Sequence, residues 1–393
     1  MVTTGVLGGR WRATVTASGG LVPWDGSPPL GWYVAADDRW HVPADEPAVR
    51  QQRVDGTPVV ETKVRIPNGD AVQRIFSVAD QGGLTIIEVE NQSPLPIAVA
   101  FDRGDLLTAL PPTAPIEGIT LPEGSIAMPV GHRATVTVAL RHQSPAAGTL
   151  PSLPPMAGVV RGWTTIIERA GRYLLPDQAL CERIAAARSE LALAGPDHPD
   201  DDPSGFAIGV GQLVRMGEEA DPWLPDLAAA LETAGRTGPH DWAFSAALDA
   251  AARVFTSVGD TRAVRDVGAL RAAAGPQRGA RPATAPDGGA RLVAWAELAL
   301  ADGPTLLPGG LPADWVGTNF EAYQVPTGPA STVSFAVRWH GARPALLWEQ
   351  HGRPVDLTAP AVAPAWRTAD VKGETLWPAP AAPPASAHPG SFA

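Results

Sequence analysis

His240, Asp241 and Trp242 stand together in "GPHDWAFSAALDAA", where a run with helical periodicity begins. An Asp just before a helix accepts hydrogen bonds from the first backbone N–H groups. An aromatic ring beside a carboxylate can also hold a sugar, which stacks on the ring and donates hydroxyl hydrogen bonds. We therefore interpret these three residues as a candidate ligand-binding site and Asp241 as a candidate catalytic acid. In the alternative, Asp241 only caps the helix and Trp242 only packs.

Hydrolysis of a glycosidic bond needs two carboxyl groups about 5 to 10 Å apart, one of which holds a proton. The other acids considered in the helical region are Asp200–Asp202 in "DHPDDDPSG" and Glu218 and Glu219 in "MGEEADPW". The first set fits a solvated loop near a helix start, where negative charge is favoured. Glu218 and Glu219 fit surface charges at a helix end. Beyond Asp241 the catalytic residues stay unknown.

The remaining reactive residue types predict neither a metal nor a cofactor. His132, His142, His340 and His351 lack HExxH, CxxC or carboxylate–His spacing. P-loop, GxSxG and complete GxGxxG patterns do not occur. The single cysteine, Cys181, lies in a helical pattern and is expected to be a buried or half-buried thiol.

Charge and hydropathy exclude several classes of partner. The chain of 393 residues has a formal net charge of -11, which disfavours nucleic acids and anionic membranes. No apolar run reaches the roughly 18 to 20 residues that span a bilayer. The N-terminal sequence lacks the basic start and apolar block of a secretory signal, so a cytoplasmic location is expected.

Residues 1–150 show the period-two pattern of strands separated by turns. In "VVETKVRIP", for example, Val60, Val64 and Ile66 share a face and alternate with charged residues. Several such strands indicate an antiparallel β-sandwich. The other expected strands lie at 11–17, 71–79, 84–92, 96–102 and 133–142.

The period changes after the proline-rich segment "GTLPSLPPM". Residues 156–305 contain about seven helical runs, which predict a helical-hairpin domain. Residues 306–378 are expected to form a C-terminal β-segment, and residues 379–393 a disordered tail. The predicted fold class is therefore α+β and multidomain.

The C-terminal β-segment is expected to close the fold and not to form a site. In "STVSFAVRWHG", Val333, Phe335, Val337 and Trp339 share one face, and "RPALLWEQ" returns as the partner strand through a turn at His340–Arg343. Together with Trp315 and Trp348, these side chains can bury a large apolar area.

The order of these regions resembles the bacterial glycoside hydrolases and phosphorylases built on a toroid of six helical hairpins. The likeness lies in "LLPGGLPADWVG" and "STVSFAVRWHGARPALLWE", which are similar to the closing segment of fucosidase-, rhamnosidase- and maltose-phosphorylase-like enzymes. "IIEVENQSPLPIAVAFD" also looks like a strand pair of their N-terminal domains. The resemblance implies a truncated, actinobacterial-type relative, and the matching stretches carry no catalytic residue.

Length separates the chain from those enzymes. Twelve helices need on the order of 250 to 350 residues, roughly twice what residues 156–302 supply. A partial toroid predicts a diverged, non-catalytic protein that binds carbohydrate or acts as a scaffold. Two alternatives stay open. One is an active glycoside hydrolase or phosphorylase with a site at the sandwich–helix junction or completed by another subunit. The other is a structural interaction protein, with a protein partner or a second copy, that has no sugar affinity.

Overall fold

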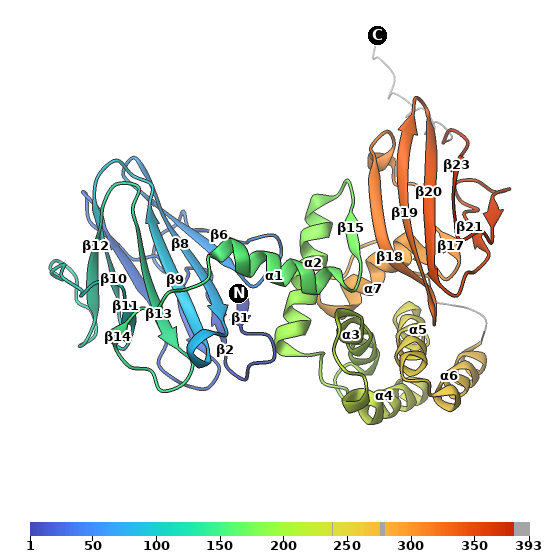
Figure 1. Cartoon of the computed structure of the whole chain (residues 1–393), viewed down its shortest axis with the longest axis horizontal. Helices are drawn as coiled ribbons and strands as arrows, with labels where there is room; N and C mark the ends of the chain where they lie inside the picture. The colour runs from blue at the N-terminus through green and yellow to red at the C-terminus, as the bar shows by residue number, and fades with distance from the viewer. Residues whose placement is uncertain (238, 276–279, 381–393) are drawn as a thin grey trace, which may run out of the picture. The chain divides into compact units, whose positions relative to one another are not determined.

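The computed structural model describes residues 1–237, 239–275 and 280–380, and within them the fold is mixed α+β with several sheets and seven α-helices (Figure 1). Contacts divide the chain into two compact units. The first unit comprises Met1–Ile167 and Ala185–Gly195, and the second comprises Glu168–Ile184 and Pro196–Ala393. These two units are defined by contacts within the structure. The predicted domain boundaries at 150, 156, 305 and 378 rest on the sequence pattern and stay a prediction.

The first unit contains three sheets, in the orders β1-β2-β3, β12-β10-β4-β5 and β14-β11-β13-β9-β8-β7-β6. All pairings are antiparallel except that of β11 with β14. The predicted strands are confirmed. The strands are β1 Val2–Gly5, β2 Arg12–Val15, β3 Leu21–Pro23, β4 Trp32–Ala35, β5 Trp40–His41, β6 Arg50–Arg53, β7 Val60–Ile66, β8 Gly69–Val78, β9 Leu84–Asn91, β10 Ile97–Phe101, β11 Leu107–Thr108, β12 Ile126–Val130, β13 Thr135–Arg141 and β14 Gly148–Thr149.

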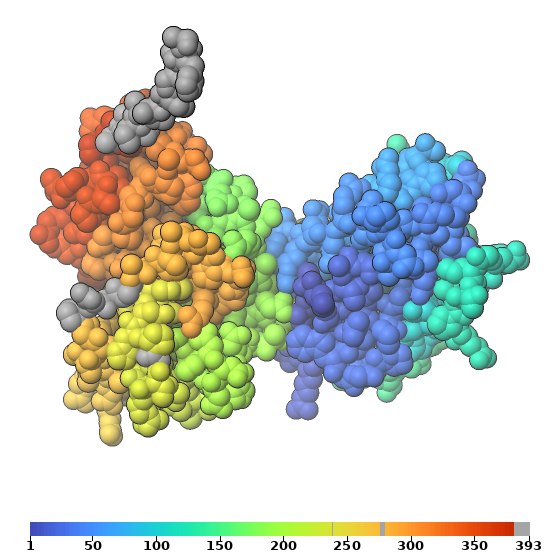
Figure 2. Space-filling model, turned by 180° about the vertical axis from the view of Figure 1, so that it is seen from behind, coloured from blue at the N-terminus to red at the C-terminus, as the bar shows by residue number. Residues whose placement is uncertain are grey.

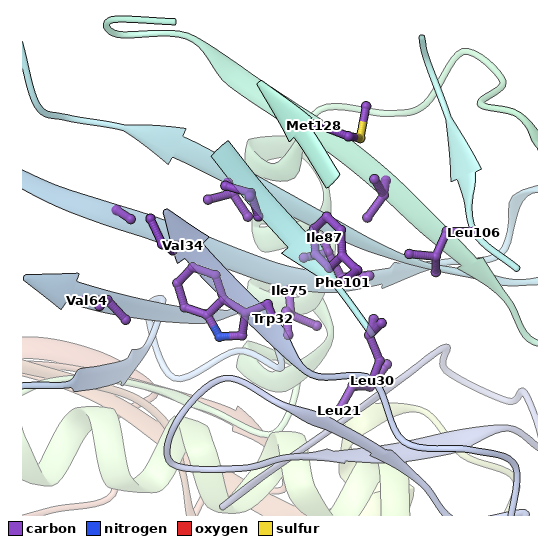
Figure 3. Close-up of a cluster of buried hydrophobic side chains, with 14 of the residues drawn as sticks. Leu21, Leu30, Trp32, Val34, Val64, Ile75, Ile87, Phe101, Leu106 and Met128 are labelled. Carbon is purple, nitrogen blue, oxygen red and sulfur yellow. The ribbon is translucent and has the colours of Figure 1, made fainter. Parts of the chain in front are cut away.

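One apolar core joins the three sheets of the first unit (Figure 3). Val15 comes from the three-stranded sheet, Trp32 and Phe101 from the four-stranded sheet, and Ile75 and Ile87 from the seven-stranded sheet, and all five are almost fully buried. The alternation of buried and exposed residues along these strands places every second side chain in this core.

The opposite face of the seven-stranded sheet has a second, smaller core. Phe76, Ile86 and Leu107 pack there with Val160 of helix α1, Met156–Glu168. The helical spacing in "VVRGWTTIIERAGRYL" predicts a helix that continues to residue 174, but α1 ends at Glu168. Gly171 has φ +122°, a conformation that favours glycine, and strand β15, Arg172–Leu174, follows it.

The second unit contains most of the helices and the C-terminal sheets, coloured from green to red in the space-filling view (Figure 2). The prediction of seven helices is confirmed, whereas their arrangement as part of a toroid stays a prediction. Besides α1, the helices are α2 Gln178–Ala194, α3 Pro203–Met216, α4 Leu224–Thr237, α5 Trp242–Ser257, α6 Thr261–Ala274 and α7 Gly289–Leu300. Short 3-10 turns cover Asp80–Gly82, Asp221–Trp223 and Ala313–Trp315.

Helices α3 and α5 lie very close together. A Cβ atom added at Gly211 would stand only 2.8 Å from Cβ of Ala250, closer than real Cβ atoms approach. Small residues at this crossing therefore let the two backbones meet, and the residues beside the crossing, Gln212 and Asp249, face a shared space.

The C-terminal β-segment forms two sheets, ordered β15-β18-β19-β20-β23 and β16-β17-β21-β22. The predicted hairpin is confirmed, since His340 pairs with Arg343. Phe335, Val337 and Trp348 are buried, while Trp315 and Trp339 are half-buried. The remaining strands are β16 Ala301–Asp302, β17 Thr305–Leu306, β18 Phe320–Gly328, β19 Ser331–His340, β20 Arg343–Gly352, β21 Leu357–Thr358, β22 Arg367–Thr368 and β23 Lys372–Leu376.

Two further expectations concern the C-terminal tail and membrane-spanning segments. Most of the predicted tail, residues 381–393, lies outside the described residues. Among the described residues, the helices are too short or too polar to cross a bilayer.

Candidate functional site

The structure places the predicted residues His240, Asp241 and Trp242 at the start of α5. Asp241 is the N-cap, and its Oδ1 accepts hydrogen bonds from the backbone N–H groups of Ala243 and Phe244, both over 3.0 Å. His240 stacks on the Phe244 ring with centroids 4.9 Å apart. The capping alternative for Asp241 is therefore confirmed, and a ligand role for the three residues stays a prediction.

The other predicted acids also have structural surroundings. Asp202 caps α3 by accepting from the N–H of Gly205, and both of its carboxylate oxygens accept from Arg291 over 2.7 Å. The hydrogen bonds from Arg291 hold the pKa of Asp202 below its usual value. Glu218 and Glu219 are exposed after the end of α3. These positions agree with the helix-start and surface interpretations.

A buried polar cluster in the second unit surrounds Glu297 of α7. The sequence pattern did not predict a role for this residue. Oε1 of Glu297 accepts from the Tyr173 hydroxyl over 2.9 Å and from Nη1 of Arg215 over 2.7 Å. The Gln212 side chain donates to both carboxylate oxygens, over 3.2 and 3.1 Å. Residues of β15, α3 and α7 therefore converge on one carboxylate that is 6% exposed.

Arg215 is held in place by more than this ion pair. Its Nη2 donates to the backbone oxygens of Ala170 and Gln324. Burial acts against the charge of Arg215, but the Glu297 carboxylate outweighs that effect and keeps the guanidinium pKa above its usual value. Arg215 and Glu297 thus form an ion pair inside the fold.

A small pocket of about 50 Å³ lies beside this cluster and opens to solvent. Its wall consists of residues spaced three or four positions apart on helices, together with residues at the end of β18. Gln212 comes from α3, Asp249 and Arg253 from α5, Glu297 from α7 and Thr327 from β18. The register of β18 and β19 shifts between Pro326 and Gly328, so Thr327 lies at a β-bulge. We name this space the Arg253 pocket.

Two polar atoms at the Arg253 pocket lack a partner. Nε of Arg253 and Oγ1 of Thr327 are buried, and neither forms a hydrogen bond with any described residue. Thr327 is only 3% exposed. A buried polar group without a partner costs on the order of 1 to 3 kcal/mol, so two such atoms at one pocket indicate that something else satisfies them.

Arg253 shares the pocket with two acids that also bind other arginines. Glu297 is paired with Arg215, and Asp249 with Arg271 at 2.5 Å. Burial lowers the pKa of Arg253, and the positive charge of Arg215 lowers it further, while Asp249 and Glu297 act in the opposite direction. A guanidinium remains charged in a protein, and the buried Nε of Arg253 has no acceptor among the described residues.

Comparison with protein-family models, with curated proteins and with solved structures finds no match for this chain. The function must therefore be argued from the site itself.

The donor set of the Arg253 pocket suits a small monoanion. A guanidinium recognises a carboxylate through parallel N–H groups, and a hydroxyl adds a further hydrogen bond. A space of 50 Å³ holds about three to five water-sized groups, which matches a carboxylate better than a phosphate. The two lining carboxylates, Asp249 and Glu297, also repel a dianion more strongly than a monoanion.

Other reactive groups do not form a comparable site. Within the described residues, no group of three or more His, Cys, Asp or Glu side chains could hold a metal ion. Cys181 is half-buried as expected, and burial raises the pKa of its thiol. His142 accepts or donates a hydrogen bond with the Thr85 hydroxyl over 2.9 Å and stacks on Trp11 in the first unit.

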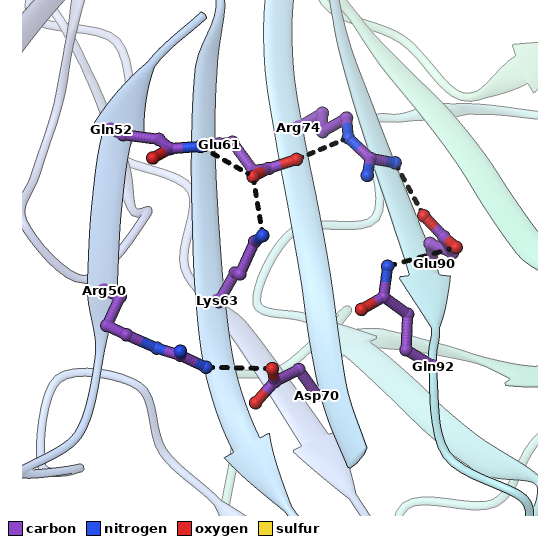
Figure 4. A network of polar contacts seen from close by, with 8 residues as sticks. All are labelled: Arg50, Gln52, Glu61, Lys63, Asp70, Arg74, Glu90 and Gln92. Atoms are coloured by element: carbon purple, nitrogen blue, oxygen red, sulfur yellow. Dashed lines mark hydrogen bonds and ion pairs between the residues drawn. The ribbon is translucent and has the colours of Figure 1, made fainter.

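A ladder of charges crosses the outer face of β6 to β9 (Figure 4). Arg74 donates to Glu61 over 2.9 Å and to Glu90 over 2.8 Å, and Lys63 lies 3.0 Å from Glu61. Because each of these charges is paired, within β7 or across neighbouring strands, the ladder is explained as sheet surface.

The sequence does contain a pattern that indicates residues of the Arg253 pocket. "GARLVAWAELAL" is apolar almost all round and contains the single acid Glu297, and "AFSAALDAAARVF" sets Asp249 and Arg253 four residues apart among alanines. A charge inside an apolar helix is seldom buried unless it is paired. Such lone charges, and not the loop acids, mark the site.

Proposed function

We propose that the chain is a non-catalytic binding protein that takes the carboxylate of an acidic sugar derivative into the Arg253 pocket. The observation that carries the proposal is the pair of buried, unpartnered atoms, Arg253 Nε and Thr327 Oγ1, at one pocket. The ligand carboxylate accepts from both, and the hydroxyl-rich part of the ligand lies at the opening.

The sugar part of the proposal rests on the resemblance to six-hairpin glycosidases and phosphorylases. In this view the first unit is a β-sandwich, supported by the core that its sheets share. Helices α2 to α7 are a shortened set of hairpins from the toroid, supported by their number and short connections. The carbohydrate-binding role is retained while the ring of helices is reduced.

The two acids that line the pocket are held by other side chains and therefore do not catalyse turnover. Glu297 accepts hydrogen bonds from Arg215, Gln212 and Tyr173, and Asp249 accepts from Arg271. A glycosidase acid must present a proton to the leaving oxygen, and its partner must reach the sugar or a water. Carboxylates bound by arginines are poorly placed for either role.

The proposal is tested by calorimetric titration of the purified chain with D-galacturonate, D-gluconate, D-galactose and inorganic phosphate. The expected order is binding of the two carboxylates, weaker or no binding of galactose, and no binding of phosphate. Arg253→Gln and Thr327→Val should both weaken the binding of galacturonate. Asp241→Asn serves as the control, because its side chain lies at the helix start and lines no part of the pocket.

Each other outcome favours a different account. Loss of binding in Asp241→Asn with retention in Arg253→Gln would move the site to His240, Asp241 and Trp242. Hydrolysis or phosphorolysis of an aryl-glycoside panel would favour the active enzyme. Binding of neither acidic nor neutral sugars would favour the structural interaction protein.

A further inference from the structure

A second pocket lies in the first unit, on the outer face of the seven-stranded sheet, and has a volume of about 400 Å³. Its floor consists of Phe76 of β8, Ile86 and Glu88 of β9, and Thr137 of β13. Its walls come from residues 109–113 and 150–155, "ALPPT" and "LPSLPP". We name this space the Glu88 groove. Its size falls in the range typical of small-ligand pockets, about 300 to 1,000 Å³.

Glu88 is the one charged side chain on a lining that is mostly apolar and proline-rich, with three threonines. It is half-buried, and burial raises the pKa of its carboxyl group, with only the charge of Arg74 opposing that effect. None of the described residues donates a hydrogen bond to its carboxylate. An unpaired carboxylate against apolar surface costs free energy unless a ligand supplies a cation or a donor.

Arg74 is the cross-strand neighbour of Glu88, but its guanidinium is occupied by other acids. Nε donates to Glu61 over 2.9 Å and Nη1 to Glu90 over 2.8 Å. Arg74 therefore neutralises the next acid along β9, Glu90, and leaves Glu88 without an ion-pair partner.

The lining leaves the Glu88 carboxylate without a donor among the described residues, although three of its residues are threonines. Five of the lining residues are prolines, which have no backbone N–H. Their fixed φ angles also make the walls stiff, so little conformational freedom is lost when a ligand enters. Leu110 stands at the rim with 71% of its surface exposed, in position to cover the apolar part of a ligand.

We propose that the Glu88 groove binds a small amphiphilic ammonium compound, whose cationic group pairs with Glu88 and whose hydrocarbon part lies against Phe76, Ile86 and Leu110. The charge of the floor is complementary to that cation, and the walls are complementary to the hydrocarbon. This site is separate from the Arg253 pocket and does not depend on the function proposed there.

The test is calorimetric titration of the full chain at pH 7.5 with n-octylammonium chloride, n-octanol and sodium octanoate, all below their aggregation concentrations. We expect octylammonium to bind at least tenfold more tightly than octanol, and octanoate to bind most weakly. Glu88→Gln should remove the preference for octylammonium over octanol. Glu123→Gln is the control, since it removes the same charge at an exposed position of the first unit that lines no part of the groove, and it should change the affinity less than twofold.

A second variant tests the hydrocarbon part. Leu110→Ser, at an exposed position that does not support the fold, should weaken octylammonium and octanol severalfold and to the same extent. The proposal is overturned if octanoate binds as well as octylammonium, if Glu88→Gln keeps the preference for octylammonium, or if Glu123→Gln loses it to the same degree. Arg253→Gln should leave octylammonium binding unchanged, which separates this result from the outcome at the Arg253 pocket.

Discussion

Arg215 of α3 and Glu297 of α7 form an ion pair, with 2.7 Å between Nη1 and Oε1, inside the second unit. The side chains are 14% and 8% exposed. The pair links α3 and α7, which contribute Gln212 and Glu297 to the wall of the Arg253 pocket. Its integrity is thus a condition for the site.

Breaking this pair on one side should destabilise the second unit strongly. Glu297→Leu or Arg215→Met leaves one buried charge without its partner, which typically costs about 3 to 5 kcal/mol. The double variant Arg215→Met/Glu297→Leu should cost less than the sum of the single changes, because no charge is left alone. Urea unfolding followed by circular dichroism measures all three. If the cost of the double variant equals the sum of the two single costs, Arg215 and Glu297 are not coupled.

His142 predicts a loss of stability in mild acid. Burial, with a contribution from the charge of Arg12, lowers the pKa of His142 from 6.5 to about 4. The folded state therefore keeps His142 neutral while the unfolded chain takes up a proton. The stability from this group is complete above pH 6.5 and falls as the pH drops toward 4, by about 3 kcal/mol in all.

The measurement is the free energy of unfolding at pH 7.0 and pH 4.5 for the wild type and for His142→Gln. The variant lacks the titrating ring, so its own loss between the two pH values should be smaller by about 2 to 3 kcal/mol. Equal losses in the two proteins would mean that the pKa of His142 is not depressed in the folded state.

Much of the element order could be predicted from periodicity, because alternation and helical spacing are local properties. β7, β13, β19 and the helices after α1 lie near where the patterns placed them, whereas α1 ends before its pattern does. Strand β15 was missed because its three residues continue a helical pattern and pair with β18, which is distant in the sequence. Pairing across such a distance leaves no periodic signal.

The Arg253 pocket could not be assembled from the sequence for the same reason. Gln212, Arg253, Glu297 and Thr327 come from four elements, and their meeting depends on the close approach of α3 and α5 at Gly211. The cap at Asp241 was predictable, since the N-cap is set by the residues that directly follow it.

The C-terminal tryptophans should differ in their contributions to stability. Trp377 is 1% exposed and packs edge-on against Trp366, whereas Trp339 is half-buried and donates its Nε1–H to Thr318 O. Trp377→Ala should cost about 3 to 5 kcal/mol, and Trp339→Ala should cost less while still lowering the melting temperature. Thermal unfolding of both variants decides the order. A Trp339→Ala variant of full stability that loses a ligand would make Trp339 part of a site.

Asp241→Ala should act on stability and not on ligand binding. Removing the cap of α5 leaves the N–H groups of Ala243 and Phe244 without their acceptor, at a cost of about 0.5 to 2 kcal/mol. Asp241→Asn keeps a capping oxygen and should cost less. The melting temperatures of the two variants test the cap, and a loss of galacturonate binding in both would contradict it as the sole role of Asp241.

The central claim is tested most directly by the ratio of the Kd values of D-galacturonate for Arg253→Gln and for the wild type, measured by calorimetry at pH 7. A hydrogen bond to a charged group contributes about 1.5 to 3 kcal/mol, and every 1.4 kcal/mol is about a factor of ten in Kd. The account predicts binding to the wild type and a ratio of at least about ten. A ratio near one, or no binding of galacturonate to the wild type, would contradict it.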